Sequence, residues 1–314
     1  MTLTQYQYIV AVDIYKSFAK AAVHCFVTQP TLSMQIQKLE EDLGVTLFDR
    51  SKKPVATTDI GRQIVDQAKV LLNEAGRISE IIQLNKGEIK GQFRLAFIPT
   101  IAPSIIPRFL KDFTELYPDL ELHITELQTE IILDQLKKGL IDAAVVATPL
   151  EAEGVIEKPL YNEPFMGFVP EKHRLFKEKF LTVKELDIHD LLLLKEGHCF
   201  RNSVINLCSN TFKKNEKSAG IHLESGNFET LIKLAKQGFG MTLIPCLLAL
   251  ELKETEDKRY IRPFENPQPS REISIIYRRA QLKIHVIDKI AAAIQKSIPK
   301  HMLSNKELAV VSPL

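Results

Sequence analysis

The chain has few cysteines, no long apolar run and almost no net charge. Its 314 residues contain four cysteines, and 41 lysines and arginines nearly balance 39 aspartates and glutamates, which leaves a net charge of +2. So small a charge does not predict nucleic-acid binding, and a claim of that function must rest on a local motif. With 45% hydrophobic residues, a chain of this length predicts about two globular domains.

The sequence also lacks membrane and export signals. No stretch of eighteen or more apolar residues occurs, and residues 1–20 lack the basic and then apolar layout of a secretory signal. We therefore expect a cytoplasmic protein that does not enter a membrane. Glutathione and thioredoxin keep thiols reduced there, so a disulfide among Cys25, Cys199, Cys208 and Cys246 would be a signal or an intermediate.

Residues 17–44, SFAKAAVHCFVTQPTLSMQIQKLEEDLG, predict two short helices joined by a turn at VTQP. Thr28 can cap the second helix, and Pro30 suits its first turn, where a missing backbone N–H costs nothing. The apolar residues of that helix repeat at helical spacing and form its inward stripe: Leu32, Ile36, Leu39 and Leu43. This layout predicts a helix-turn-helix.

The polar side chains around the second helix are candidates for DNA contact, because they can reach base edges or phosphates in a major groove. They are Thr28, Gln29, Thr31, Ser33, Gln35 and Lys38. The following residues predict a short strand, a basic turn at Arg50, Lys52 and Lys53, and a return strand, typical of a wing whose cations contact the DNA backbone. The alternative is a small helical packing unit with a solvated basic turn, but the order of these features favours the winged helix-turn-helix.

A long helix is predicted after Thr58, which can cap it. Its apolar residues between Ile60 and Ile82 form a face too wide for a helix lying free in water. The face requires a partner, either a second copy of the chain or another part of the same chain. The sequence NKGEIKGQ then has the glycine and charge content of a hinge, so we expect a domain boundary near Gly91.

From Phe93 onward, short β-like runs alternate with helical ones, which favours parallel α/β construction with binding groups at strand ends and helix starts. A second such set begins near Pro164, and residues 273–298 would return the chain to the first lobe. Thr100 and Thr129 lie where helices begin. Each is either an N-cap or a hydroxyl that faces an effector between two lobes, and the sequence leaves both readings open.

The chain resembles the LysR-type transcriptional regulators in three segments: FAKAAVHCFVTQP with QPTLSMQIQKLEEDLGVTLFDR, the TTDIG that opens the next helix, and LESGNFETLIKLAKQGFGMTLIP. This resemblance implies an α/β protein with an N-terminal winged helix-turn-helix, a linker helix and a C-terminal two-lobed sensor domain similar to periplasmic binding proteins. The implied boundaries are 1–58 for the DNA-binding domain, 59–90 for the linker and hinge, and 91–314 for the regulatory domain, with lobe I at about 91–162 and 267–300 and lobe II at about 163–266.

Two cysteines lie nine residues apart in GHCFRNSVINLC, residues 197–208. Cys199 starts a predicted helix beside His198 and close to Arg201, and the helix dipole and a nearby cation would stabilise its thiolate. Cys208 falls on the apolar face that also carries Val204, Leu207, Thr211 and Phe212, so burial would leave it a poor nucleophile.

The spacing of the two cysteines constrains what oxidation does. Nine helical residues separate the Cα atoms by roughly 13 Å, whereas a disulfide needs about 4.4 to 6.8 Å, so a Cys199–Cys208 bond would unwind or bend the segment. Three other interpretations of the two cysteines are a zinc site that also uses His189 and His198, two incidental cysteines, and the reactive site of a thiol peroxidase. Zinc motifs have more compact spacing, and a peroxidase has no use for a winged helix.

The GHCFRNSVINLC segment is similar to that of the peroxide-sensing LysR-type regulators. The similarity implies a hydrogen-peroxide sensor, not an enzyme, with Cys199 as the peroxidatic residue, Cys208 as the resolving residue, and His198 and Arg201 as neighbours that tune the thiol. It further implies peroxide-contacting hydroxyls at Thr100 and Thr129 and a cleft arginine at Arg271, although Ser270 departs from the basic residue often found at its position.

The implied partners of such a sensor are an operator in double-stranded DNA, hydrogen peroxide, RNA polymerase, a glutaredoxin or thioredoxin as reductant, and a second subunit in a homodimer or a homotetramer. No metal or cofactor is implied. The alternative within the family is a regulator that responds to a small metabolite in the cleft between the lobes.

Overall fold

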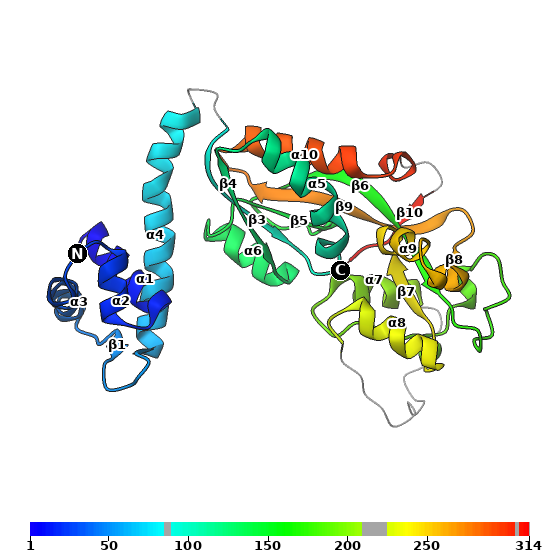
Figure 1. The fold of residues 1–314 in the computed structure, drawn as a ribbon, viewed down its shortest axis with the longest axis horizontal. Coiled ribbons are helices and arrows are strands. Elements are labelled where there is room, and N and C mark those ends of the chain that lie inside the picture. The colour runs from blue at the N-terminus through cyan, green and yellow to red at the C-terminus, as the bar shows by residue number, and fades with distance from the viewer. Residues whose placement is uncertain (85–88, 209–224, 305–307, 314) are drawn as a thin grey trace. The chain divides into compact units, whose positions relative to one another are not determined.

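The computed structural model describes residues 1–84, 89–208, 225–304 and 308–313, without the side chains of residues 79–84. The chain divides into two compact units (Figure 1). The first comprises Met1–Glu88 with Lys138–Leu140, and the second comprises Ile89–Lys137 with Ile141–Leu314. Each unit is described by itself.

The first unit is helical with a small hairpin. Its elements are α1 (Leu3–Tyr15), α2 (Phe18–His24), α3 (Gln29–Leu43), β1 (Phe48–Asp49), β2 (Ala56–Thr57) and α4 (Asp59–Leu84). The predicted caps are confirmed: the Thr28 hydroxyl accepts a hydrogen bond from the Thr31 backbone N–H, and the Thr58 hydroxyl accepts one from that of Gly61. Gly44 ends α3 in the left-handed conformation, which glycine adopts without steric cost.

The inward stripe of α3 forms the core of this unit. Leu32, Ile36 and Leu39 are fully buried against α1, the hairpin and the start of α4, and Leu43 packs at the margin. Strands β1 and β2 pair antiparallel, with Phe48 opposite Thr57. The predicted helix-turn-helix with a short two-stranded wing is therefore confirmed.

The second unit is built on one mixed sheet with the strand order β4-β3-β5-β9-β6-β7, in which β10 also pairs with β9 and β8 with β6. Its elements are β3 (Gly91–Phe97), α5 (Ala102–Leu116), β4 (Leu120–Glu126), α6 (Thr129–Lys137), β5 (Ala143–Thr148), β6 (Val155–Phe168), α7 (Cys199–Leu207), α8 (Phe228–Gln237), β7 (Thr242–Pro245), α9 (Cys246–Leu252), β8 (Ile261–Pro263), β9 (Gln268–Arg278), α10 (Ile284–Ser297) and β10 (Leu308–Val310).

The expectation of parallel construction holds for only part of this sheet. Strand β3 pairs parallel with β4 and β5, as the alternation of strand and helix predicts. Strands β6 and β9 run antiparallel to each other over most of their length, and β7 and β8 pair antiparallel with β6. The sheet is mixed because β9 returns beside β5 in the opposite direction.

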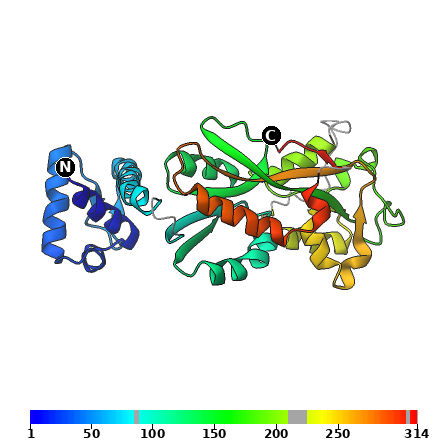
Figure 2. The same ribbon diagram turned by 90° about the horizontal axis from the view of Figure 1, so that it is seen from above.

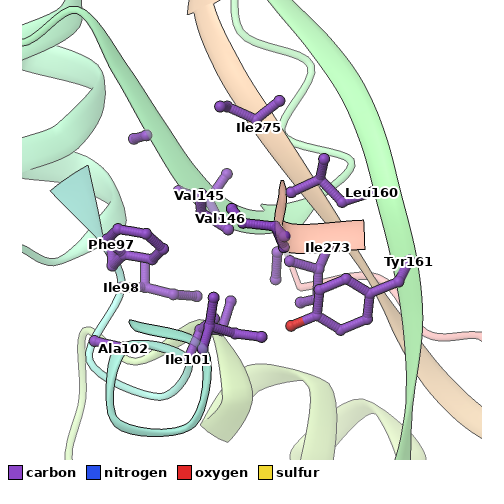
Figure 3. Close-up of a cluster of buried hydrophobic side chains, with 14 of the residues drawn as sticks. Phe97, Ile98, Ile101, Ala102, Val145, Val146, Leu160, Tyr161, Ile273 and Ile275 are labelled. Carbon is purple, nitrogen blue, oxygen red and sulfur yellow. The ribbon is translucent and has the colours of Figure 1, made fainter. Parts of the chain in front are cut away.

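The largest core cluster surrounds the centre of the sheet (Figure 3). Side chains of β5, β6 and β9 meet those of the β3–α5 connection there, among them Val145, Leu160, Ile273 and Ile101. Helices α5 and α10 pack against each other, and the two views show α10 lying along the long strands (Figure 2). The α/β architecture of the regulatory half is therefore confirmed.

A second cluster lies around the far end of β6, with β7, α7 and α8. Phe165 of β6, Phe200 and Val204 of α7, and Leu243 of β7 are buried there, and Cys208 belongs to the same cluster. The second unit thus has two packing centres, both of which include residues of β6, and α7 is part of the second centre.

Candidate functional site

The residues predicted for DNA contact fall into two groups, exposed and half-buried. Gln29, Thr31 and Lys38 are exposed, as are Thr28 before the helix and Lys52 and Lys53 in the wing. Ser33 and Gln35 are half-buried because they bond within the unit: Ser33 Oγ accepts from Arg50 Nη1 at 3.0 Å, and Gln35 Oε1 accepts from Gln5 Nε2 at 3.3 Å. The DNA-contact roles of all these residues stay predictions.

Arg50 is bound inside the unit. Its Nη2 lies 3.1 Å from Glu40 Oε2, and its guanidinium lies over the ring of Phe18. The other Glu40 oxygen accepts the backbone N–H groups of Leu47 and Phe48 at 2.7 and 3.2 Å. Glu40 therefore fixes the wing to α3, and it was not predicted from the sequence because a glutamate on a helix face usually indicates only exposure to solvent.

The candidate redox site begins at the first residue of α7. Cys199 is half-exposed, and its Sγ lies 2.8 Å from Oγ1 of Thr129, the first residue of α6. A thiol at this end of a nine-residue helix lies at the positive end of the helix dipole, a position typical of reactive cysteines. The structure therefore brings together two residues that lie 70 positions apart and that were both predicted for the site.

A close contact between two loops supports this pairing. Gly197 has φ +87°, a conformation that favours glycine, and a Cβ built on it would lie 2.9 Å from the Gln128 side chain. Gln128 directly precedes Thr129, so Gly197 lets the loop before α7 approach the loop before α6. The sequence signal for this contact is the glycine itself, which directly precedes His198 and permits the positive φ.

His198 is buried and neutral at pH 7. Burial lowers its pKa, and the positive charge of Lys195 adds to that effect. Its Nε2 has no hydrogen-bond partner among the described residues and lies near Gly226. His198 therefore stands beside Cys199 as a neutral imidazole rather than as a cation.

Arg201 donates from Nη1 to the backbone oxygen of Leu194 at 3.3 Å. Residues two positions apart on a helix do not face each other, so Arg201 and Cys199 project from different sides of α7. The tuning role expected of Arg201 stays a prediction.

Cys208 caps the other end of α7. It is 2% exposed, and burial raises the pKa of its thiol to about 11, with smaller contributions from the charges of Asp190 and Asp187. Both cysteines are free thiols at opposite ends of an intact helix. The predicted neighbours Thr211 and Phe212 lie outside the described residues.

Arg271 occupies a fully buried position on β9. Its Nε and Nη2 lie 3.0 and 2.7 Å from Glu163 Oε2, and its Nη1 donates to Thr100 Oγ1 at 2.9 Å. The guanidinium also lies 4.9 Å from the ring centroid of Phe200, the residue after Cys199. The predicted cleft arginine thus contacts one predicted hydroxyl and the helix that carries the reactive thiol.

These contacts resolve what Thr100 and Thr129 do in this structure. Ile101, not Thr100, is the N-cap residue of α5, and no side chain caps that end. Thr129 is the first residue of α6 and thus lies inside the helix, so neither threonine occupies an N-cap position; Thr100 bonds Arg271 and Thr129 bonds Cys199. The sequence reading missed Glu163 and Phe200, the other partners of Arg271.

The two remaining cysteines contribute to packing. Cys246 is buried in the larger core cluster, and burial raises the pKa of its thiol to about 12, helped by the negative charge of Glu163. Burial also raises the pKa of Cys25, which packs against the core of the first unit. Both therefore hold their thiol protons at neutral pH.

Two searches of the described residues concern other chemistries. No group of three or more His, Cys, Asp or Glu side chains is placed to hold a metal ion. No helix in the described part of the chain combines the length and hydropathy needed to cross a membrane.

Comparison with known proteins places the chain in a family. Residues 3–62 match the bacterial regulatory helix-turn-helix protein of the lysR family, and residues 86–297 match the LysR substrate binding domain. The hydrogen peroxide-inducible genes activator of Haemophilus influenzae is 34% identical over 95% of this chain and 97% of its own.

Two solved structures cover nearly the whole chain. A full-length OxyR variant of Pseudomonas aeruginosa is 33% identical with a TM-score of 0.74 over 94% of this chain and 98% of its own. A hydrogen-peroxide-bound OxyR variant of Corynebacterium glutamicum is 30% identical with a TM-score of 0.63 over 100% of this chain and 98% of its own. The chain therefore belongs to the LysR family of bacterial helix-turn-helix regulators.

Proposed function

We propose that this chain is a cytoplasmic DNA-binding regulator that senses hydrogen peroxide through a reversible Cys199–Cys208 disulfide. The observation that carries the proposal is the geometry of α7, which holds one thiol at its N-terminus against the Thr129 hydroxyl and the other buried at its end. The names of the relatives, which are hydrogen peroxide-inducible activators and OxyR proteins, support the same stimulus.

The chemistry has two steps. The Cys199 thiolate attacks one peroxide oxygen, the O–O bond breaks, and hydroxide leaves to be protonated as water, which gives a sulfenic acid. The Cys208 thiolate then attacks the Cys199 sulfur, the S–O bond breaks, and a second water forms with the disulfide. A dithiol of the glutaredoxin or thioredoxin class supplies two electrons and two protons to restore both thiols. One peroxide is consumed per switch, so the protein is a sensor rather than a turnover enzyme.

The conformational output follows from the length of α7. Because the ends of the helix are about 13 Å apart and a disulfide spans about 4.4 to 6.8 Å, the bond forms only when α7 unwinds. Unwinding removes Phe200 and Val204 from the second core cluster. We infer that this repacking changes how paired subunits present their recognition helices to an operator, and thereby how RNA polymerase is recruited.

The subunits pair through α4 in this proposal. Ala68 of this helix is buried in the core of the first unit, but Leu71 and Ile78 are exposed at 38% and 68%, so this part of the apolar face is left open within the unit. A second copy of α4 would cover it, as in a homodimer, and two dimers would form a homotetramer.

Operator footprinting tests the proposed function. The reduced protein should protect one pattern of bases, and brief treatment with micromolar peroxide should change that pattern until a dithiol is added. A footprint that responds to a small metabolite and not to peroxide would contradict the proposal, and so would steady peroxide consumption without DNA binding.

Substitutions in the first unit should separate base reading from backbone contact. Gln29→Ala or Thr31→Ala should relax preference at particular base pairs, by about 1–3 kcal/mol per position. Lys52→Ala or Lys53→Ala should weaken binding to all sequences and flatten its salt dependence, because a phosphate contact carries no sequence information. Binding to operators with single base changes, measured at several salt concentrations, checks this, and a uniform loss for Gln29→Ala would contradict the assignment of α3.

The pH dependence of the second step should report the unwinding of α7. In the intact helix the raised pKa of Cys208, about 11, keeps its thiol protonated at neutral pH. Because Cys208 must leave its cluster before it reaches Cys199, we expect it to ionise near the ordinary value of 9.0. The rate of disulfide formation after a pulse of peroxide should rise with pH, reach half of its maximum near pH 9.0 and level off above that, whereas a half-maximal rate near pH 11 would mean attack from the intact helix.

A further inference from the structure

The segment that follows α10 makes a contact that the proposed sensor chemistry does not use. Strand β10 pairs parallel with the start of β9, with Leu308 opposite Gln268 and Val310 opposite Ser270. The Val311 backbone N–H continues this pairing by donating to Ser270 O at 2.7 Å. The segment thus adds a short strand to the sheet beside β9.

Beyond β10 the same segment reaches α7 (Figure 1). The backbone oxygen of Ser312 accepts hydrogen bonds from Ser203 Oγ and Asn206 Nδ2, both at 3.3 Å. Ser203 and Asn206 lie one turn apart, so this single carbonyl bonds two side chains of one helix face. Val311 also packs against the cluster that contains Cys208, and Pro313 is buried.

The contact extends to the reactive residue itself. Ser203 is fully buried, and its hydroxyl lies 3.2 Å from the backbone oxygen of Cys199 as well as 3.3 Å from that of Ser312. The hydroxyl carries one proton and shares it between the two carbonyls. The β10 segment therefore bonds the middle and the end of α7 and, through Ser203, the turn that begins at Cys199.

These bonds exist only while α7 is helical. Ser203 and Asn206 face Ser312 together because residues three apart lie on one face of a helix. Unwinding α7 to join Cys199 and Cys208 separates the two side chains and takes Val204 and Cys208 out of the cluster against which Val311 packs. The contacts thus stabilise the dithiol state and are lost in the disulfide state.

From this geometry we propose that residues 308–313 form a clasp that holds α7 in its helical, dithiol state and sets the barrier to disulfide formation. Ser203 and Asn206 are positioning residues in this role, since neither touches the peroxide. The proposal rests on the proposed peroxide function, because it concerns the second step of that chemistry.

The test compares the rate of sulfenic-acid formation and the rate of disulfide formation in three variants of this protein. One variant ends at Ser304, the second is Asn206→Ala, and the control is Asn202→Ala, an exposed asparagine on the same helix. Loss of the clasp should change the rate of sulfenic-acid formation at Cys199 by less than about twofold relative to the unchanged protein. The rate of disulfide formation should rise severalfold, and by up to about tenfold in the shortened chain, as expected for losing one or two hydrogen bonds. The reduction potential of the pair should become more negative, while the control matches the unchanged protein.

Hydrogen exchange gives a second readout on the unchanged chain. The Val311 amide should be protected in the dithiol state and exchange faster once the disulfide has formed. Asn206→Ala keeps the test valid even if the shortened chain misfolds, because this substitution removes only one bond of the clasp.

Several results would overturn the proposal. Equal rates of disulfide formation in Asn206→Ala and Asn202→Ala would do so, as would equal slowing of both chemical steps, which indicates a general loss of structure. A Val311 amide that stays protected in the disulfide state would also contradict it. If peroxide forms no Cys199–Cys208 disulfide even in the unchanged protein, the proposed function fails together with the clasp; if the disulfide forms at one rate in every variant, only the clasp fails.

Discussion

Replacing Cys199 by serine should abolish the response to peroxide. The variant keeps the first turn of α7, because serine is close to cysteine in size and its hydroxyl can bond Thr129 Oγ1 as the thiol does. Its free energy of unfolding should therefore change by less than about 1 kcal/mol. Without the thiolate no sulfenic acid forms, so neither the disulfide nor the footprint change should appear at any peroxide dose that switches the unchanged protein.

Two further serine substitutions isolate the role of Cys199. Cys208→Ser should still form the sulfenic acid but stop there, and Cys199 should then over-oxidise to sulfinic acid because no resolving thiol is present. Cys246→Ser is the matched control, since that thiol, with a pKa raised to about 12, is not ionised at neutral pH. It should form the Cys199–Cys208 disulfide normally. A Cys199→Ser protein that switched with peroxide would end the sensor account and leave a regulator with another ligand.

Replacing Arg271 by methionine should produce the largest loss of stability among substitutions at the candidate site. It leaves the Glu163 carboxylate buried at 2% exposure without its cation, a change that costs about 3–5 kcal/mol in other proteins. It also leaves Thr100 without its donor. Adding Glu163→Gln should recover much of the loss, because the neutral amide no longer requires a cation, so the two changes should not be additive.

A surface pair provides the control for this substitution. Lys158 and Asp288 lie 2.7 Å apart, as close as Arg271 and Glu163, but their side chains are 41% and 52% exposed. Lys158→Met should therefore cost no more than about 1 kcal/mol. Denaturant unfolding of the reduced proteins measures the free energy of unfolding of Arg271→Met, of Arg271→Met with Glu163→Gln, of Lys158→Met and of the unchanged protein. If Arg271→Met and Lys158→Met cost the same, the buried pair does not organise the site.

The helices and their caps could be predicted from the sequence because each depends on residues close together in the chain. The stripe of Leu32, Ile36 and Leu39 defines α3, and threonine before a helix predicts the caps at Thr28 and Thr58, all of which the structure confirms. The alternation after Phe93 likewise predicts β3, β4 and β5 with their helices.

Contacts between residues far apart in the chain could not be predicted in this way. Glu163 and Arg271 lie 108 positions apart, and nothing in either segment identifies its partner. The antiparallel course of β6 and β9 depends on how distant strands pair, which local alternation does not encode. Strand β10 has only three residues, too few to establish a period, so the contact of its segment with α7 emerged only from the structure.

The residues of the candidate site were predicted from the sequence, but their arrangement was not. The pattern GHCFRNSVINLC predicts that Cys199 and Cys208 act as a pair, and the structure adds that the Thr129 hydroxyl contacts the Cys199 sulfur. It also shows that His198 is buried, which lowers its pKa. These outcomes depend on which loops approach α7, a matter of tertiary packing.

Mass spectrometry of the intact and digested protein, before and after brief exposure to micromolar peroxide, tests the central claim most directly. The account predicts one new disulfide that joins Cys199 to Cys208, with Cys25 and Cys246 unmodified and the link removed by a dithiol. A Cys199 that stays a free thiol while the operator footprint changes would contradict it.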